Sequence, residues 1–497
     1  MSEVRSAKKY ERTKISKTLI DFLQGGIWLL LLIGVFHALY TIWAGYLLLD
    51  LPFETTRPES FILNGVRHLL MEIPLYPPTG KEPYIYHVYN PLTYVPSGFI
   101  AKHLDLSIKQ ALMIGRTISF VSTIGVAILL GIWVWMQNRE VKPAIFMIAS
   151  LLFFHSVTFT DYFRLRPESS AIFFTVSGVI VFLFRTKFFI SISAFIFFVA
   201  FLFKQSFVAA PVSIFIFLLL SGKLRDATRF FIVYGSLIAI FIVLMYFLTG
   251  NGYFQHTFLS MAVNDVNPLS TWKLFGPLLI KLFWGPLLIL PLALHLVTKD
   301  SRYKFLAFYF LISTAWTLYS AGKIGAALNY FSEWAVLVLI VISLSLCVCS
   351  IGKHKYLKFF MLAVLVCNVL SVAAFEGVFS DPILIKNQEI VEYVNKYKGM
   401  VGTKLITHEA IAIHTGEIVA FDWFLLDQLQ EKGVINLDSI YNGIINGKYD
   451  ILILGKNITS KAENKILQIA QNGPYDLKYE DDMILEFNLI RSVALND

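Results

Sequence analysis

The stretch from residue 110 to residue 137 reads QALMIGRTISFVSTIGVAILLGIWVWMQ. A helix of about 20 apolar residues is long enough to cross the hydrocarbon core of a bilayer. Comparable apolar runs lie near 25–49, 143–159, 168–184, 188–203, 205–221, 229–249, 275–298, 304–320, 332–351 and 357–378. The sequence therefore predicts a polytopic α-helical membrane protein with about eleven transmembrane helices.

The composition of the chain agrees with a membrane location. Of its 497 residues, 56% are apolar and only 15% are charged, which excludes an ordinary soluble enzyme. The net charge is +8, but lysine and arginine recur in short clusters between the apolar runs and form no single basic face. We therefore expect no nucleic-acid partner.

Basic residues mark every second connection between the predicted helices. These clusters are Arg5 to Lys17, Arg139 with Lys142, Arg185 with Lys187, Lys223 to Arg229, Lys299 to Lys304, and Lys353 to Lys358. Connections rich in lysine and arginine stay in the cytoplasm. The pattern predicts a multi-pass protein of the inner (cytoplasmic) membrane with a cytoplasmic N-terminus. The loops at 50–109, 160–167, 250–274 and 321–331, and the chain after Phe375, are then extracytoplasmic.

The composition changes near residue 382, where long apolar runs give way to short ones. We therefore expect a membrane domain at 1–381, which includes the large first outer loop 50–109, and an extracytoplasmic soluble α/β domain at 382–497. In this second domain Val401–Ile406 and Tyr449–Leu454 are predicted strands, and Trp423–Lys432 and Ser460–Gln471 are predicted helices.

The first outer loop is too long to be a simple connector. Pro58 and Glu59 favour the start of a helix that runs to about Met71. At about 100° per residue, the face that carries Glu59 also carries Ile62, Leu63, Val66 and Leu70, and the opposite face carries Asn64, His68 and Glu72. We expect this helix to lie on the membrane surface with Glu59 toward the transmembrane helices. There the carboxylate is either partnered, for example by Arg57, or functional.

The second outer loop, Thr160–Glu168, carries two carboxylates and two guanidinium groups, which are Asp161, Glu168, Arg164 and Arg166. Arginines on the outer side are unusual unless they bind an anion, so the pair indicates a phosphate site. Ion pairs of the arginines with Asp161 and Glu168 explain the loop equally well. Further polar residues of the outer side are Lys204, Lys323, Asn329 and Tyr330.

Short motifs occur in a fixed order along the membrane domain. They are Arg57-Pro58-Glu59-Ser60, Leu75-Tyr76-Pro77-Pro78, Tyr89-Asn90-Pro91-Leu92, Gly115-Arg116, Arg166-Pro167-Glu168, Lys204-Gln205, Gly322-Lys323-Ile324-Gly325 and Asn329-Tyr330-Phe331. In order and sidedness this series resembles the GT-C fold glycosyltransferases, in the branch related to protein mannosyltransferases and lipid A aminoarabinose transferases. That family usually has an aspartate in the first outer loop, whereas this chain has Glu54 and Glu59.

The resemblance implies an inverting membrane glycosyltransferase with a polyprenyl-phosphate-linked sugar as donor. The acceptor would be a hydroxyl of a glycan, lipid or protein outside the cytoplasm, activated by a carboxylate base. Glu59 is the expected base, with Glu54 and Glu168 as further catalytic candidates. The expected substrate-binding residues are Arg57, Asp161, Arg164, Arg166, Lys204, Lys323, Asn329 and Tyr330. The resemblance requires no cofactor and leaves a divalent metal optional.

A transporter or flippase of lipid-linked sugars is the alternative from another functional class. It would also use charged residues near the membrane. The sequence contains no inverted repeat and no matched pair of Gly/Pro-broken helices, both of which are typical of transporters. This favours the transferase.

Overall fold

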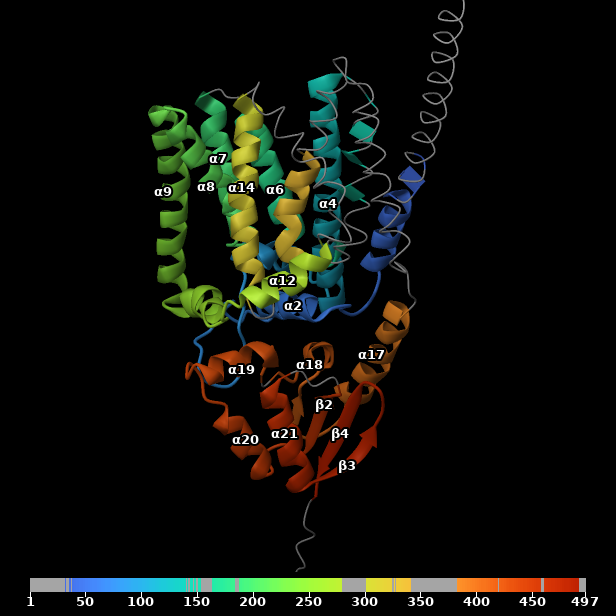
Figure 1. Cartoon of the computed structure of the whole chain (residues 1–497). Coiled ribbons are helices and arrows are strands. Elements are labelled where there is room, and N and C mark those ends of the chain that lie inside the picture. The colour runs from blue at the N-terminus through green and yellow to red at the C-terminus, as the bar shows by residue number, and fades with distance from the viewer. Residues whose placement is uncertain are drawn as a thin grey trace, which may run out of the picture.

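Two parts make up the molecule in this computed structural model, a helical bundle and a smaller tail that contains a β-sheet (Figure 1). The structure describes most of residues 38–278 and 301–490. Outside the described part lie 1–31, 153–162, 184–186, 279–300, 341–381, 457–459 and 491–497, with single positions in 33–37, 140–150, 324–327 and at 419.

The bundle consists of apolar helices that lie side by side (Figure 1). They are α4 (Ile108–Asn138), α6 (Pro167–Leu183), α7 (Lys187–Phe203), α8 (Ala209–Leu220), α9 (Leu224–Thr249), α14 (Ser301–Ala321) and a helix at Asn329–Ile340. In the described part, α4 and α9 are long and apolar enough to cross a membrane, and α6, α7, α8 and Asn329–Ile340 are apolar but shorter.

Six of the predicted transmembrane segments coincide with α4, α6, α7, α8, α9 and α14. The bounds differ most for α8, which begins at Ala209 because residues 204–208 form a turn, and for α9, which begins at Leu224. The predictions at 25–49, 143–159, 275–298 and 332–351 reach into residues outside the described part, and 357–378 lies wholly outside it.

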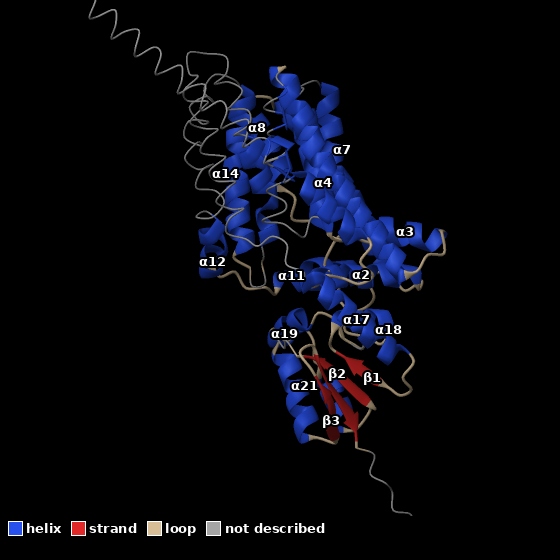
Figure 2. Ribbon diagram, turned by 90° about the vertical axis from the view of Figure 1, so that its right-hand side faces the viewer, coloured by secondary structure: helices blue, strands red, loops and turns tan. Residues whose placement is uncertain are grey.

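Short elements cover the end of the bundle that faces the tail (Figure 2). They are α2 (Arg57–Leu70), η1 (Pro91–Thr93), α3 (Val95–His103), α10 (Gly252–Phe254), η3 (Gln255–Leu259), α11 (Ser260–Ala262), α12 (Pro268–Leu278) and η5 (Leu328–Phe331). The predicted helix in the first outer loop is α2, with Pro58 in its first turn.

Helix α2 is buried on both faces, which differs from the expectation of a helix lying on a membrane surface. Ile62, Leu63 and Val66 pack toward α3 and α4, as the apolar face predicts. On the opposite face Asn64 and His68 are also buried, because the tail and residues 84–90 cover it.

The tail has the predicted α/β architecture. Its elements are α17 (Pro382–Lys398), β1 (Lys404–Ile406), α18 (Glu409–Thr415), α19 (Trp423–Glu431), α20 (Asp438–Ile445), β2 (Ile451–Gly455), α21 (Lys461–Asn472), β3 (Tyr475–Glu480) and β4 (Ile484–Leu489). The sheet order is β1-β2-β4-β3, with β1 parallel to β2 and the other pairs antiparallel. Four predicted elements correspond to β1, β2, α19 and α21.

The tail is joined to the first outer loop by main-chain pairing and ion pairs. Tyr84 and Ala420 form a parallel β-bridge, next to which Phe421 N–H donates to Tyr84 O at 2.9 Å. Arg57 Nε lies 2.6 Å from Glu409 Oε1 on α18. These contacts hold the tail directly over α2.

Candidate active site

Three buried charged side chains and one partly buried amide meet where the bundle joins the first outer loop. Lys204 Nζ lies 2.6 Å from Glu168 Oε1, and Asn329 Nδ2 donates to the same oxygen at 2.5 Å. Arg166 Nε lies 3.3 Å from Glu168 Oε2. We call Arg166, Glu168, Lys204 and Asn329 the Glu168 cluster.

Separate elements supply the members of the Glu168 cluster. Pro167 begins α6, so Glu168 lies in the first turn of that helix, where a carboxylate is favoured by the helix dipole. Lys204 occupies the turn between α7 and α8, and Asn329 lies in η5. The fold thus brings together Glu168 and Asn329, which are 161 positions apart in the chain.

Two tyrosines line the cluster. Lys204 Nζ lies 4.9 Å from the ring centre of Tyr330 and 5.8 Å from that of Tyr89. Aromatic faces attract a cation at such distances. With two cations and one carboxylate, the cluster carries an excess of positive charge, so it is suited to bind an anionic group.

The structure brings five of the predicted site residues together. They are Arg166, Glu168, Lys204, Asn329 and Tyr330. Arg166 forms an ion pair with Glu168, as in the structural alternative for this loop, whereas Asp161 lies outside the described residues.

No described contact joins the two other predicted cations, Arg164 and Lys323, to the Glu168 cluster. Arg164 is buried on the same loop as Arg166. Lys323 is partly exposed and directs its ammonium toward Met261 O at 3.5 Å, so its described contact lies outside the Glu168 cluster.

Glu59 is sealed in a bidentate ion pair with Arg116 of α4. The two Nε/Nη2 to Oε distances are 2.8 and 2.9 Å, and both side chains are fully buried. The N–H groups of Thr55 and Leu165 donate to the same carboxylate at 2.9 and 2.8 Å. Burial raises the pKa of Glu59, but Arg116 and the hydrogen bonds outweigh it and hold that pKa below its usual range.

This geometry gives Glu59 a different ion-pair partner from the expected one and bears on its expected role as base. Its ion-pair partner is Arg116, whereas Arg57 pairs with Glu409 of the tail. A general base needs an oxygen within hydrogen-bond reach of the proton it takes, and each Glu59 oxygen already accepts from two donors or more. The contacts therefore argue for a structural role, in which Glu59 fastens the first outer loop to α4.

Glu54 and Arg57 lie at the contact with the tail instead of in the Glu168 cluster. Glu54 Oε2 is 3.0 Å from His414 Nε2 of α18, and its other oxygen is buried without a hydrogen bond from any described residue. Both residues face α18, so tail and loop share a polar boundary.

Three residues near the site escaped the sequence analysis as functional candidates. Arg116 carried a signal, because a charge inside an apolar run demands a buried partner. Tyr89 belonged to a quoted motif without an assigned role. Asp422 gave no signal, since only the folded tail brings it beside the first outer loop.

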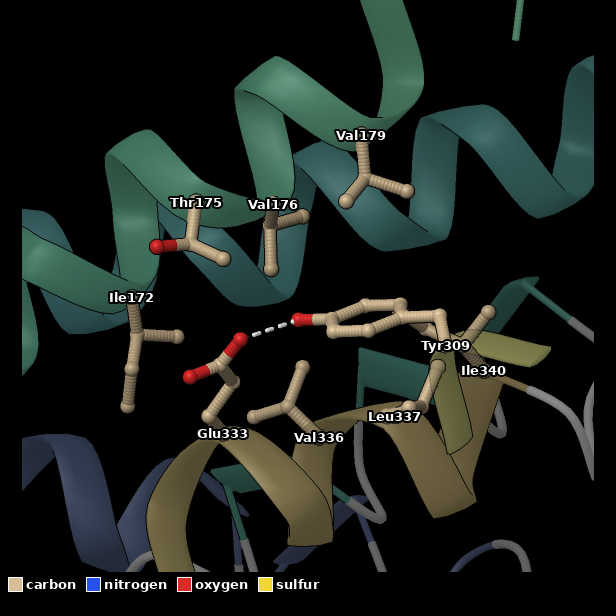
Figure 3. A pocket seen from close by; sticks show the side chains of 9 residues that line it. All are labelled: Ile172, Thr175, Val176, Val179, Tyr309, Glu333, Val336, Leu337 and Ile340. Atoms are coloured by element: carbon tan, nitrogen blue, oxygen red, sulfur yellow. Dashed lines mark hydrogen bonds between the residues drawn. The ribbon is translucent and has the colours of Figure 1, made fainter. Parts of the chain in front are cut away.

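A narrow pocket lies deeper in the bundle, on the side of the Glu168 cluster that points away from the tail. Figure 3 shows Glu333 and Tyr309 turned toward one another, with Tyr309 O–H donating to Glu333 Oε1 at 2.6 Å. Thr175 faces them from α6, and the remaining lining is aliphatic. Ile172 and Glu333 each follow a cluster residue by one helical turn, so the pocket lining begins next to the cluster on two helices.

No group of three or more His, Cys, Asp or Glu side chains is placed to hold a metal ion within the described part of the chain. The groups suited to an anion there are the side chains of Arg166 and Lys204.

The arrangement of the bundle, loop and tail matches a solved membrane enzyme. The structure aligns with ArnT from Cupriavidus metallidurans bound to undecaprenyl phosphate, at a TM-score of 0.62 and 10% sequence identity, over 93% of this chain and 98% of that chain. The apo form of the same protein gives 0.61 and 10%, over 92% and 98%. The chain has a GT-C fold.

An oligosaccharyltransferase from Archaeoglobus fulgidus in the apo form aligns over 77% of this chain and 64% of its own length, at 11% identity and a TM-score of 0.46. No family model and no curated protein matches the sequence.

Proposed function

We propose that this protein is a membrane glycosyltransferase that moves a sugar from a polyprenyl-phosphate donor to an acceptor hydroxyl on the outer side of the membrane, with inversion at the anomeric carbon. The Glu168 cluster is the observation that carries the proposal. It holds two buried cations at the tail-facing end of the bundle, in a GT-C fold whose ArnT counterpart binds undecaprenyl phosphate.

The cations of the cluster suit the chemistry of the departing group. When the bond between the anomeric carbon and the phosphate oxygen breaks, the phosphate gains negative charge. Fixed cations lower the barrier because they favour the charge that develops in the transition state. In our proposal Lys204 and Arg166 bind the phosphate, and Glu168 and Asn329 position Lys204.

The side chains beneath the cluster have the apolar character that a lipid tail requires. The pocket lining is aliphatic apart from Glu333, Thr175 and Tyr309, and it begins one helical turn below the cluster. A polyprenyl phosphate held by the cluster would therefore place its first isoprene units among the bundle helices. The sugar would point toward the tail.

A transfer assay with a charge-only variant tests the proposal. Purified protein in liposomes receives a panel of radiolabelled polyprenyl-phosphate hexoses and pentoses together with lipids and glycans of the cell envelope as acceptors, and release of polyprenyl phosphate is measured. Lys204→Gln removes the charge but keeps a hydrogen-bond donor for Glu168. We expect kcat to fall about 10²- to 10³-fold, as for loss of one preorganised transition-state contact.

Lys273→Ala is the matched control, because Lys273 is exposed on the same end of the bundle. It should retain full activity. If wild-type protein moves labelled donor between the leaflets but releases no polyprenyl phosphate, the protein is a flippase and the transferase proposal is wrong.

Metal dependence can be decided in the same assay. Because two side-chain cations are available to the donor phosphate, we expect transfer to continue at an unchanged rate in excess EDTA. Loss of activity with EDTA, restored by Mg²⁺ or Mn²⁺, would show instead that a divalent ion neutralises the phosphate.

A further inference from the structure

The tail segment Ala420–Trp423 is held against the first outer loop by main-chain contacts. Its β-bridge to Tyr84 and the hydrogen bond from Phe421 N–H fix the backbone. The ring of Phe421 packs on that of Phe61 of α2, with centroids 5.7 Å apart. Phe421 also shares an apolar cluster with Tyr89 and with Leu165, the neighbour of Arg166.

Asp422 follows directly in this segment and presents a carboxylate at the junction. Its backbone is left-handed, with φ of 63°, and its Oδ1 accepts from Leu425 N–H at 3.2 Å as the N-cap of α19. The other oxygen accepts no hydrogen bond from any described residue, and the side chain keeps part of its surface accessible. One oxygen is therefore available to a ligand.

The surroundings of Asp422 link it to the Glu168 cluster. Burial raises the pKa of Asp422 to about 6, and the charge of Glu409 adds to the rise, whereas Arg57 and Leu425 N–H oppose it. Burial also raises the pKa of Tyr89, whose electrostatic neighbours include Arg166, Glu168 and Asp422. Tyr89 is thus within electrostatic reach of both the tail carboxylate and the charged residues of the cluster.

We infer that Asp422 is the general base of the transfer reaction, supplied by the tail. The inference rests on the proposed function. The acceptor O–H gives its proton to the free oxygen of Asp422 while its oxygen forms a bond to the anomeric carbon. The bond from that carbon to the phosphate oxygen breaks, and the polyprenyl phosphate leaves with the electron pair.

The other carboxylates around the junction are already engaged. Glu59 is sealed by Arg116, Glu168 holds Lys204, and Glu409 pairs with Arg57. Glu54 faces His414. Asp422 is the carboxylate of this group that combines an available oxygen with a pKa near neutral, which suits a general base.

Asp422→Asn separates catalysis from structure. Asparagine caps helices as well as aspartate does and tolerates a left-handed backbone, so a purely structural Asp422 predicts unchanged melting and transfer. For a base we expect transfer to fall about 10²- to 10⁴-fold with unchanged melting temperature and donor binding. Asp438→Asn removes an exposed carboxylate of the tail and should behave as wild type.

The pH profile and chemical rescue give independent readouts. A general base works in its deprotonated form, so wild-type kcat/KM should rise as the pH increases through about 6. The pH profile of Asp422→Asn should lack this rise. The charged and titratable groups around this carboxylate are Arg57, Glu409 and Tyr89. Their own contacts stay in place in Asp422→Asn, so the difference between the two pH profiles reports on Asp422. Azide needs no deprotonation, so it should restore polyprenyl-phosphate release in Asp422→Asn and yield an inverted glycosyl azide.

Full transfer by Asp422→Asn in an active preparation would overturn the inference and leave the proposed function standing. A loss that azide does not restore would also overturn it, because a base is dispensable for an anionic nucleophile. If neither wild type nor variant releases polyprenyl phosphate from any donor, the proposed function itself fails.

Discussion

Glu59 and Glu168 are both buried carboxylates, yet their surroundings assign them different roles. Glu59 forms an ion pair with one cation among the described residues, Arg116, and main-chain N–H groups also donate hydrogen bonds to its carboxylate. Glu168 shares two cations and an amide that come from separate elements. Only the second arrangement leaves an excess of positive charge, and we therefore place the donor phosphate there.

Glu59→Gln distinguishes a structural from a catalytic Glu59. The substitution leaves Arg116 as a buried charge with a neutral partner, and breaking such a pair costs about 3–5 kcal/mol. We expect a lower melting temperature and lower yield, with unchanged kcat per folded molecule. A normally stable but inactive variant would restore Glu59 as the base.

Glu72→Gln is the control for that experiment. Glu72 is exposed beyond the end of α2 and pairs with the exposed Lys102 at 2.9 Å. Surface pairs of this kind contribute little, so its melting temperature should match that of wild type.

At the scale of elements, α2 is clamped between the bundle and residues 84–94. An added Cβ at Gly65 would lie 2.4 Å from Tyr94 Cδ1 and 3.2 Å from His87 Nδ1. In an open helix, Gly→Ala is favourable by roughly 0.5–1 kcal/mol. At Gly65 the clash reverses this sign.

We therefore predict that Gly65→Ala lowers the melting temperature and reduces transfer, because α2 must shift away from Tyr94. Gly235→Ala on α9 is the matched control, since its added Cβ would meet only Phe231 at 4.0 Å. It should cause no loss in either measurement. Unchanged melting of Gly65→Ala would show that α2 packs less closely than described.

At the scale of the whole molecule, the tail, α2 and α12 gather at one end of the bundle (Figure 1). The turn at residues 221–223 between α8 and α9 lies at the other end. We propose that the tail-bearing end is extracytoplasmic, as the alternating basic connections predict.

Cysteine labelling checks this orientation in a variant without Cys347, Cys349 and Cys367. A cysteine at Val401, which is 94% exposed, should react with a membrane-impermeant maleimide in intact cells or spheroplasts. A cysteine at Ser221 should react only after permeabilisation. The reversed pattern would place the tail in the cytoplasm and contradict the proposed side of transfer.

The sequence by itself determined the helical membrane class, most helix positions that the structure describes, the α/β tail and the short list of outer charges. These features are local, because apolar length and periodicity set a helix or strand wherever it packs. Tertiary structure alone decided which charges meet. Lys204 and Asn329 contact Glu168, and Arg116 pairs with Glu59. The tail places Asp422 within electrostatic reach of Tyr89. Partner choice in a buried site depends on three-dimensional distance and desolvation, and neither follows from spacing along the chain.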